Sequence, residues 1–259
     1  MSTPRPTPCI DILMYHSVSD AGGATSIAPG VFADQMRAIA DAGLPVLTMD
    51  DYLAVAEGRV AMPKHAVVIT FDDGFEDFGN TAWPILQRHG FRPIVYLPTA
   101  FVGRAEGWRG IGSPPRKLMG WDRIKGLAAD GVLFGSHTVS HPDLGALTPD
   151  AVGAELTRAK EVIARHLGRP VQHFAPPYGL AGAAVRAKIA EHYKTSVGTR
   201  LGQAGPGADL HDLPRLEMFY FTDMRHWHRH LAGRGAVYLA KRRALRAVRG
   251  AIMNPWRGI

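Results

Sequence analysis

The sequence is almost without cysteine and has no long hydrophobic run. Cys9 is the single cysteine among the 259 residues, which excludes a disulfide scaffold, a cysteine-rich zinc module and a redox-active pair. No apolar stretch reaches the roughly 18 residues that a membrane span needs. The first residues, Met1–Pro8, are polar and proline-rich, unlike a secretory signal. Hydrophobic residues make up 46% and charged residues 20% of the chain, so we expect a globular cytoplasmic protein.

The positive charge of the chain is concentrated near its C-terminus. The formal net charge is +7. Residues 220–259 alone hold nine Lys or Arg and one acid, Asp223, which gives a local charge of +8. The rest of the chain has 21 basic and 22 acidic residues and is nearly neutral. Because no recognition motif accompanies the charge, we expect no nucleic-acid partner.

Short apolar runs alternate with helical patterns along the chain, and we find no internal repeat. This alternation is typical of a parallel sheet, either closed into a barrel or left open as a doubly wound sheet. Thr148 and Gly168 have the positions of helix caps around residues 149–167. The predicted strands are Ile10–Tyr15, Ala66–Phe71, Ile94–Leu97, Val132–Phe134, Val171–Phe174, Lys194–Val197 and Leu213–Phe219. The predicted helices are Pro29–Ala42, Asn80–Gly90, Trp121–Asp130, Pro149–Leu167 and Ala181–Glu191.

Reactive side chains follow several of these strands directly. His16 follows the first strand, Asp72-Asp73-Gly74 follows the second, and His137 and His141 follow the strand at 132–134. In either fold the carboxyl ends of parallel strands share one edge, so we expect these side chains to meet. Adjacent residues of an extended chain point to opposite sides, so Asp72 and Asp73 can have different tasks.

Two imidazoles and one carboxylate form a ligand set suited to a divalent metal with open positions for water and substrate. A second carboxylate can then accept a proton from that water. Each motif alone also has an ordinary interpretation, because Asp-Asp-Gly occurs in tight turns and histidine is a common half-buried residue. Their occurrence after separate strands, at one predicted edge, favours the metal site.

Three motifs together resemble the polysaccharide deacetylase (NodB-homology) family of metal-dependent carbohydrate esterases. They are Thr70-Phe71-Asp72-Asp73-Gly74, His137-Thr138-Val139-Ser140-His141 and Phe174-Ala175-Pro176-Pro177-Tyr178-Gly179, and the resemblance spans His16 to Phe219. It implies an irregular (β/α) barrel and hydrolysis of the N-acetyl group of an amino sugar. It also implies a divalent ion, for which zinc is the first expectation and cobalt, nickel or manganese are alternatives.

The resemblance also implies roles for individual residues. Asp72 would be the general base, and the backbone N–H of Tyr178 would help to hold the oxyanion. The metal ligands would be Asp73, His137 and His141. The residues implied in substrate binding are Pro177, Tyr178 and Trp121, although Trp121 can equally be a wall or core aromatic.

The chain departs from the common family pattern at two points. Many members have an arginine where Ala175 stands, and that arginine pairs with the catalytic base. A branch similar to the poly-N-acetylglucosamine deacetylases lacks it and begins with a segment like Met14-Tyr15-His16, so we assign the chain to that branch. Arg215, near a strand end, is our candidate for the missing guanidinium.

The second departure concerns the acid that protonates the leaving group, which many members supply through a Leu-x-His motif near the C-terminus. No fitting motif of this kind is present. His16 therefore becomes the candidate general acid, with a hydrogen-bonded structural histidine as the alternative.

We predict a barrel domain over residues 1–220 and a basic helical extension over residues 221–259. Gly233 and Gly235 interrupt the extension, which predicts two short helices. Its mixture of arginine and apolar residues suits either an anionic membrane surface or a terminal helix that covers the barrel. A membrane role would fit a lipid-linked saccharide as substrate.

The alternatives to an N-acetyl-sugar deacetylase are an amidase or imidase acting on a non-sugar amide, and a catalytically silent glycan-binding barrel.

Overall fold

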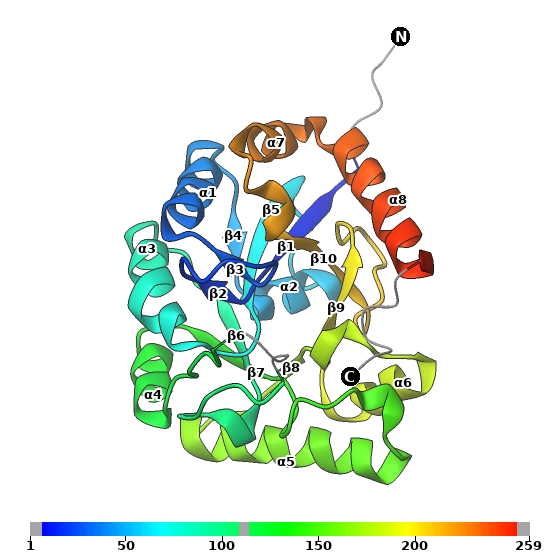
Figure 1. The fold of residues 1–259 in the computed structure, drawn as a ribbon. Helices are drawn as coiled ribbons and strands as arrows, with labels where there is room; N and C mark the ends of the chain where they lie inside the picture. The colour runs from blue at the N-terminus through cyan, green and yellow to red at the C-terminus, as the bar shows by residue number, and fades with distance from the viewer. Residues whose placement is uncertain (1–6, 109–113, 253–259) are drawn as a thin grey trace.

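The computed structural model describes residues 7–108 and 114–252, and a parallel β-barrel lies at the centre of this part of the chain (Figure 1). Its sheet has eight strands among the described residues, in the order β1-β10-β9-β8-β7-β6-β5-β4, and pairing of β1 with β5 closes all of them except β4 into a ring. The predicted irregular barrel is therefore confirmed, and the open sheet is excluded. The ring strands are β1 (Cys9–Tyr15), β5 (His65–Phe71), β6 (Ile94–Leu97), β7 (Leu133–Ser136), β8 (His173–Phe174), β9 (Thr195–Leu201) and β10 (Leu213–Glu217). The remaining strands are β2 (Ser17–Val18), β3 (Ser26–Ile27) and β4 (Val46–Leu47).

Helices surround the barrel (Figure 1), because each parallel strand needs a crossover to reach the next one. Helix α2 has a different place, since its Met49 and Tyr52 pack with the side chains that fill the barrel interior. The helices are α1 (Pro29–Asp41), α2 (Met49–Ala56), α3 (Trp83–Arg88), α4 (Trp121–Ala129), α5 (Pro149–Leu167), α6 (Ala183–His192), α7 (Met224–Arg229) and α8 (Ala236–Ile252).

The strands alternate between an interior face and a face that packs on the helices. On β1, Ile10 and Ile12 belong to the interior cluster, whereas Leu13 belongs to the outer cluster under the helices. Because side chains alternate with a period of two, the interior set continues to the residues that follow β1 and β5. These residues are His16 and Asp72, so the strand pattern itself places both over the barrel interior.

Most predicted elements are present, with differences at their ends. Helix α5 begins after Thr148, whose side chain accepts a hydrogen bond from the Ala151 N–H, and ends at Gly168 in the left-handed conformation (φ 66°), as predicted. The helix predicted over residues 80–90 instead opens with a π-helical turn, Phe78–Ala82, before α3. Strand β8 begins two residues later than predicted, at His173, and ends at Phe174 as predicted.

The C-terminal segment packs on the barrel in two helical parts. Helix α7 continues into a π-helical turn, η6 (His230–Arg234), in which Gly233 takes a φ of 72°. Trp227 and Leu231 are buried in the outer core. The prediction of two short helices was wrong for the second, since α8 has 17 residues. The division at residue 220 stays a prediction. Among the described residues, no helix is both long and apolar enough to cross a membrane.

Candidate active site

The parallel pairing of β1 and β5 brings His16 and Asp72 together. The two strands pair in register along their whole length, up to Tyr15 opposite Phe71. The Asp72 N–H then donates to the Tyr15 carbonyl oxygen (2.9 Å). As a result, the His16 Nε2 lies 3.8 Å from the Asp72 Oδ2. The structure therefore joins two residues that lie 56 positions apart and that were predicted separately from the sequence.

Asp73, His137 and His141 form a buried cluster at the same end of the barrel. Asp73 Oδ1 lies 3.5 Å from His137 Nε2 and 3.4 Å from His141 Nε2. Asp73 has a φ of 71°, so it leaves the extended conformation of β5. Strict alternation ends at this left-handed residue, so strand geometry alone no longer decides the relative directions of Asp72 and Asp73. Both carboxylates act electrostatically on His137.

The cluster fits a divalent metal ion by its chemistry and by its spacing. Asp73 Oδ1 is buried and has no hydrogen-bond partner among the described residues. Zinc bonds of about 2.0 Å in tetrahedral geometry separate neighbouring ligand atoms by about 3.3 Å, close to the distances found here. The His137 Nδ1 is hydrogen-bonded to the Ala175 carbonyl oxygen (2.6 Å), which leaves Nε2 for an ion. Although burial opposes ionisation, the two imidazoles hold the pKa of Asp73 well below its usual value.

The loop that carries both histidines is held by an acidic residue of α5. Thr138 and His141 have left-handed φ angles of 72° and 57°, so the loop is a turn. Glu155 accepts hydrogen bonds from the backbone N–H groups of Val139 (2.7 Å) and Ser140 (3.0 Å). Glu155 was not predicted from the sequence, because nothing in its local pattern distinguishes it from other helical glutamates. The contact offsets the strain of the turn.

Arg215 forms a bidentate ion pair with Asp72. Its two terminal nitrogens lie 2.7 Å from the two carboxylate oxygens, and its Nε donates to the Gly198 carbonyl oxygen (2.8 Å). Burial raises the pKa of Asp72, but the guanidinium outweighs this and keeps the pKa below its usual value. The structure therefore brings a guanidinium from β10 to the carboxylate, although Ala175 cannot supply one.

The environment of His16 shifts its pKa. Burial lowers the pKa of His16, and the nearby Asp72 opposes this only in part. The ordinary pKa of histidine is near ~6.5, so this shift reduces the protonated fraction that could donate at neutral pH. A neutral His16 would first have to receive any proton that it donates.

Aromatic rings border His141 on two sides. The Trp108 ring stacks on the His141 ring with centroids 3.9 Å apart, and the Tyr178 ring meets it edge-on at 4.8 Å. Trp108 was missed in the sequence analysis, because it lies in a loop without a recognisable motif. Trp121 has another place: its ring stacks on His166 of α5 (3.9 Å), in the outer helix layer. Pro177, also named from the sequence, is buried beside Tyr178.

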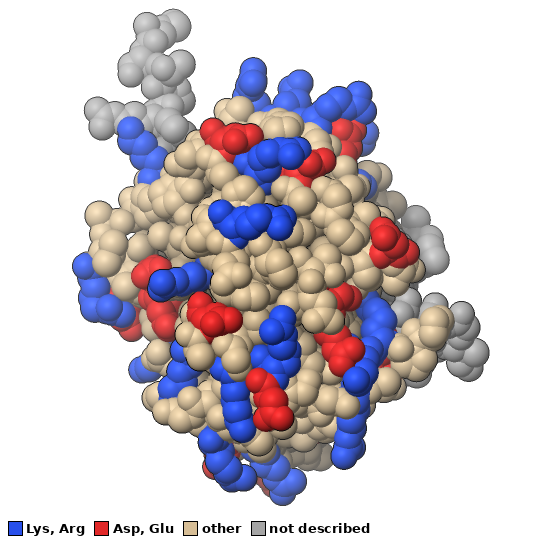
Figure 2. Space-filling view, turned by 90° about the vertical axis from the view of Figure 1, so that its left-hand side faces the viewer, with Lys and Arg blue, Asp and Glu red and all other residues tan. Residues whose placement is uncertain are grey.

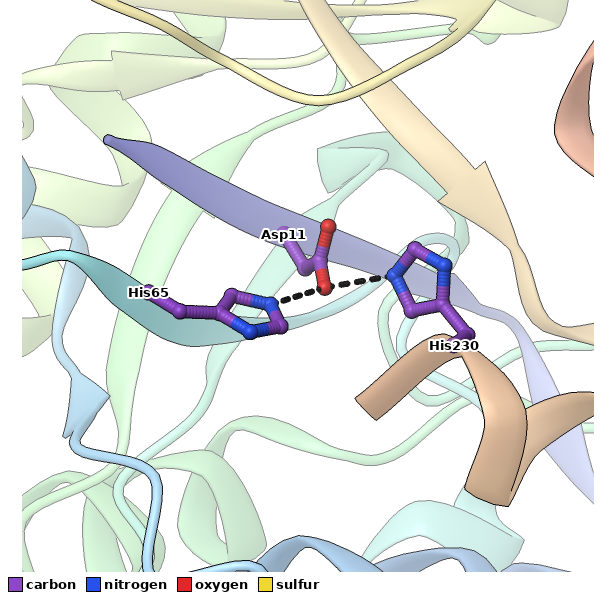
Figure 3. A group of neighbouring side chains, drawn as sticks. All are labelled: Asp11, His65 and His230. Atoms are coloured by element: carbon purple, nitrogen blue, oxygen red, sulfur yellow. Dashed lines mark hydrogen bonds and ion pairs between the residues drawn. The ribbon is translucent and has the colours of Figure 1, made fainter. Parts of the chain in front are cut away.

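A second cluster with metal-ligand residue types has a different geometry. Asp11 Oδ2 lies 2.7 Å from both His65 Nε2 and His230 Nε2 (Figure 3). These are hydrogen-bond distances, shorter than the separation of about 3.3 Å between tetrahedral ligands. The other carboxylate oxygen accepts a hydrogen bond from Gln203 (2.8 Å). We interpret this cluster as a buried hydrogen-bond network that joins β1, β5 and η6.

Comparisons with known proteins agree with the barrel fold and identify a family. The chain is 24% identical to YxkH from Bacillus subtilis over 210 residues, which are 81% of this chain and 71% of that protein. It is 26% identical to the peptidoglycan-N-acetylglucosamine deacetylase of Bacillus cereus, but over only 45% of this chain and 37% of that protein.

Among solved structures, the Streptococcus pyogenes deacetylase PplD in complex with acetate has 27% identity and a TM-score of 0.71, over 81% of this chain and 92% of that one. IcaB from Ammonifex degensii has 22% identity and a TM-score of 0.75, over 88% of this chain and 97% of that one, which is a likeness of fold. A sequence model described as polysaccharide deacetylase matches residues 59–197. Because that match spans more than half of the chain and includes its three motifs, the chain belongs to the polysaccharide deacetylase family.

Proposed function

We propose that this chain is a metal-dependent N-deacetylase that releases acetate from an N-acetylated amino sugar in a glycan or lipid-linked glycan. The observation that carries the proposal is the placement of the buried Asp73–His137–His141 cluster next to the Asp72–Arg215 ion pair. Acetate in the complex of the similar Streptococcus pyogenes deacetylase supports the same reaction class. The structure of IcaB supports the assignment to the branch named from the sequence, through its fold.

The roles of the residues follow from their geometry. A divalent ion such as Zn²⁺, held by Asp73, His137 and His141, would supply a water of lowered pKa and polarise the acetyl carbonyl. Asp72 accepts a proton from the attacking water, and each of its oxygens keeps a lone pair beyond the one that Arg215 uses. Arg215 orients this carboxylate and keeps it ionised.

The proton then has to reach the departing nitrogen. The water oxygen forms a bond to the acetyl carbon, the C–N bond breaks, and acetate and a free amine leave. His16 Nε2 lies 3.8 Å from the Asp72 Oδ2 that would hold the proton. We assign His16 to the transfer of this proton to the amine, which agrees with its lowered pKa. The backbone N–H of Tyr178 stabilises the developing oxyanion.

The substrate contacts are aromatic. Trp108 and Tyr178 border His141, and flat aromatic faces suit the apolar faces of sugar rings. Pro177 shapes the same loop. Trp121 is a weaker candidate here, because its ring already stacks on His166. This aromatic border favours a sugar over the alternative of a non-sugar amide, and the intact ligand cluster beside a base disfavours a silent binding barrel.

Cytoplasmic location and contact with the inner membrane face also remain proposals. Helix α8 supports the second, because Val237, Leu245 and Val248 are exposed by 83%, 50% and 55% on a helix that is rich in arginine and lysine. Such a helix suits an anionic membrane surface.

Acetate release by the purified full chain tests the proposed function. Substrates would be N-acetylglucosamine oligomers, lipid-linked N-acetylhexosamines and simple acetamides, each with chelator and with added zinc, cobalt, nickel or manganese. We expect metal-dependent release from a sugar that falls by at least about 100-fold in Asp72→Asn. The matched control is Asp41→Asn, an exposed residue at the end of α1. Release from acetamides alone would favour the amidase, and no release by a metal-loaded protein would favour the binding barrel.

A further inference from the structure

A groove lined by arginines lies beside the loop that carries Tyr178. Its volume is about 380 Å³, and four arginines from α6, β9 and α8 converge on it together with one acid, Asp212. The lining residues are Gly179, Ala181, Arg186, Thr199, Arg200, Leu201, Asp212, Arg243 and Arg246. We call this feature the arginine groove. Like charges from separate elements repel one another, so their convergence on one cavity suits a negatively charged occupant.

The acceptors within the protein do not neutralise these arginines. Arg200 faces Asp212 (Nε to Oδ2, 3.4 Å) and also donates to its carbonyl oxygen (2.8 Å). Arg186 donates to the Ala181 carbonyl oxygen (2.8 Å). Arg243 has no acceptor among the described residues, and Arg246 has only an electrostatic contact with Glu217. Four cations and one lining acid therefore leave an excess of positive charge in the groove.

Another face of the molecule lacks such an arrangement. On the face formed by α1, α3 and α4, lysines and arginines are interspersed with aspartates and glutamates, and no broad patch of one sign is visible (Figure 2). Mixed charge of that kind is usual for a solvated surface. The arginine groove lies on other elements, α6, β9 and α8, and two of its arginines come from the basic extension noted in the sequence.

The arginine groove adjoins the Tyr178 loop and the strand segment that contacts Arg215. Gly179 follows Tyr178 directly, and a side chain at Gly179 would collide with Thr199 on the groove wall. Thr199 in turn follows Gly198, whose carbonyl oxygen accepts the hydrogen bond from Arg215 Nε (2.8 Å). An extended substrate with its acetyl group at the metal cluster can therefore reach the groove with another part.

We propose that the arginine groove binds a phosphate ester of the substrate, so that the preferred substrate is a phosphorylated N-acetylated saccharide. Guanidinium groups match phosphate oxygens in bidentate geometry, and a phosphate or diphosphate carries enough negative charge to balance several arginines. The inference rests on the proposed deacetylase function for the nature of the saccharide. The phosphate could also belong to a membrane phospholipid, and the experiment separates these two sources.

Binding without turnover tests the proposal. The probes are an N-acetylglucosamine trimer and the same trimer with a 1-phosphate, titrated calorimetrically into the metal-loaded Asp72→Asn full chain. We expect the phosphorylated trimer to bind about tenfold or more tightly, as charge-assisted hydrogen bonds suggest, and salt to reduce the difference. In the same background, Arg243→Gln combined with Arg246→Gln should remove this preference. Lys241→Gln, on the same helix but outside the arginine groove, is the matched control and should keep it.

Several outcomes would overturn the proposal. Equal affinities for the two trimers would do so, as would a preference that survives the double substitution. The third outcome combines two results: the trimers bind equally, and the double variant no longer floats with phosphatidylglycerol vesicles. This outcome would assign the groove to a phospholipid headgroup. Failure of the deacetylase function would give a different result. The wild-type chain would then release no acetate from either trimer, but it would still bind the phosphorylated trimer more tightly in an arginine-dependent way.

Discussion

The ion pair between Asp72 and Arg215 controls how basic the proposed catalytic carboxylate is. The guanidinium lowers the pKa of Asp72 against the effect of burial, so the carboxylate stays ionised well into acid. Replacement of Arg215 by Gln removes this charge. We expect the acid limb of the kcat/KM profile to move to higher pH and the rate to fall by about 100-fold or more.

The pH profile from 4 to 9 checks this prediction, with thermal unfolding measured in parallel because Arg215 is fully buried. Arg215→Lys keeps the charge but not the paired hydrogen bonds, so part of the activity should return. Arg88→Gln removes an exposed arginine of α3 and serves as control. An acid limb that does not move in Arg215→Gln would contradict the role assigned to the pair.

Asp11 makes stability depend on pH at the other end of β1. Burial alone would raise the pKa of Asp11, but hydrogen bonds with His230 and His65 lower it from 3.8 to about 2. The folded-state pKa lies below the unfolded one, so the stabilisation is present above pH 4 and is lost as the pH falls toward 2. The shift corresponds to about 2 kcal/mol.

Denaturant unfolding of Asp11→Asn at pH 7 and pH 3 tests this network. We expect a loss of about 2 kcal/mol at pH 7 and a smaller difference from the wild type at pH 3. Asp20→Asn, at an exposed turn, is the control. The same loss at both pH values would mean that the charge of Asp11 is unimportant.

Single residues also show how far the sequence predicts the candidate site. The motifs identified Asp72, Asp73 and the two histidines, because paired carboxylates and paired imidazoles that directly follow buried strands rarely occur together without a chemical role. Trp108 and Glu155 were not identified. Each contacts the histidine loop from a distant part of the chain, and only the folded arrangement shows which tryptophan or glutamate does so.

At the scale of elements, α5 positions the loop that carries the candidate metal ligands. Glu155 holds two backbone N–H groups of that loop, so Glu155→Gln should weaken zinc affinity by about 10- to 100-fold, the usual effect of residues that support metal ligands. Competition with a chromogenic chelator measures the affinity directly.

The control for this substitution is Glu161→Gln, an exposed glutamate on the same helix. Because Glu161→Gln makes the same change in charge, an equal loss of affinity in both variants would show that the effect is electrostatic and long-range. A change only in Glu155→Gln would support its role in positioning the loop.

Element boundaries were predicted where local chemistry decides them. Thr148 and Gly168 define α5, because a hydroxyl cap and a left-handed glycine act within a few residues of the helix ends. The π-helical turn before α3 and the short β8 were not predicted. Both depend on how neighbouring elements pair and pack, which residue types within the segment do not encode.

At the scale of the whole molecule, α8 offers an apolar surface beside its cations. Leu245→Glu combined with Val248→Glu should reduce flotation with vesicles that contain phosphatidylglycerol, because two exposed apolar side chains become charged. Vesicles of phosphatidylcholine alone should bind the wild type weakly. Val60→Glu changes a valine of similar exposure, 54%, outside the extension, and should leave flotation unaltered. Equal flotation of all variants would remove the membrane proposal.

The order of residues was enough to specify the alternation of strands and helices, the family motifs and the location of the basic extension, because each of these is local in the chain. Three features became visible only in the folded chain: the sheet closes between β1 and β5, Arg215 reaches Asp72 across the barrel, and arginines of α6, β9 and α8 share one groove. These features join residues that are far apart in the chain. Their contacts depend on the closure of the barrel and on the packing of the last helices, and no local pattern specifies either.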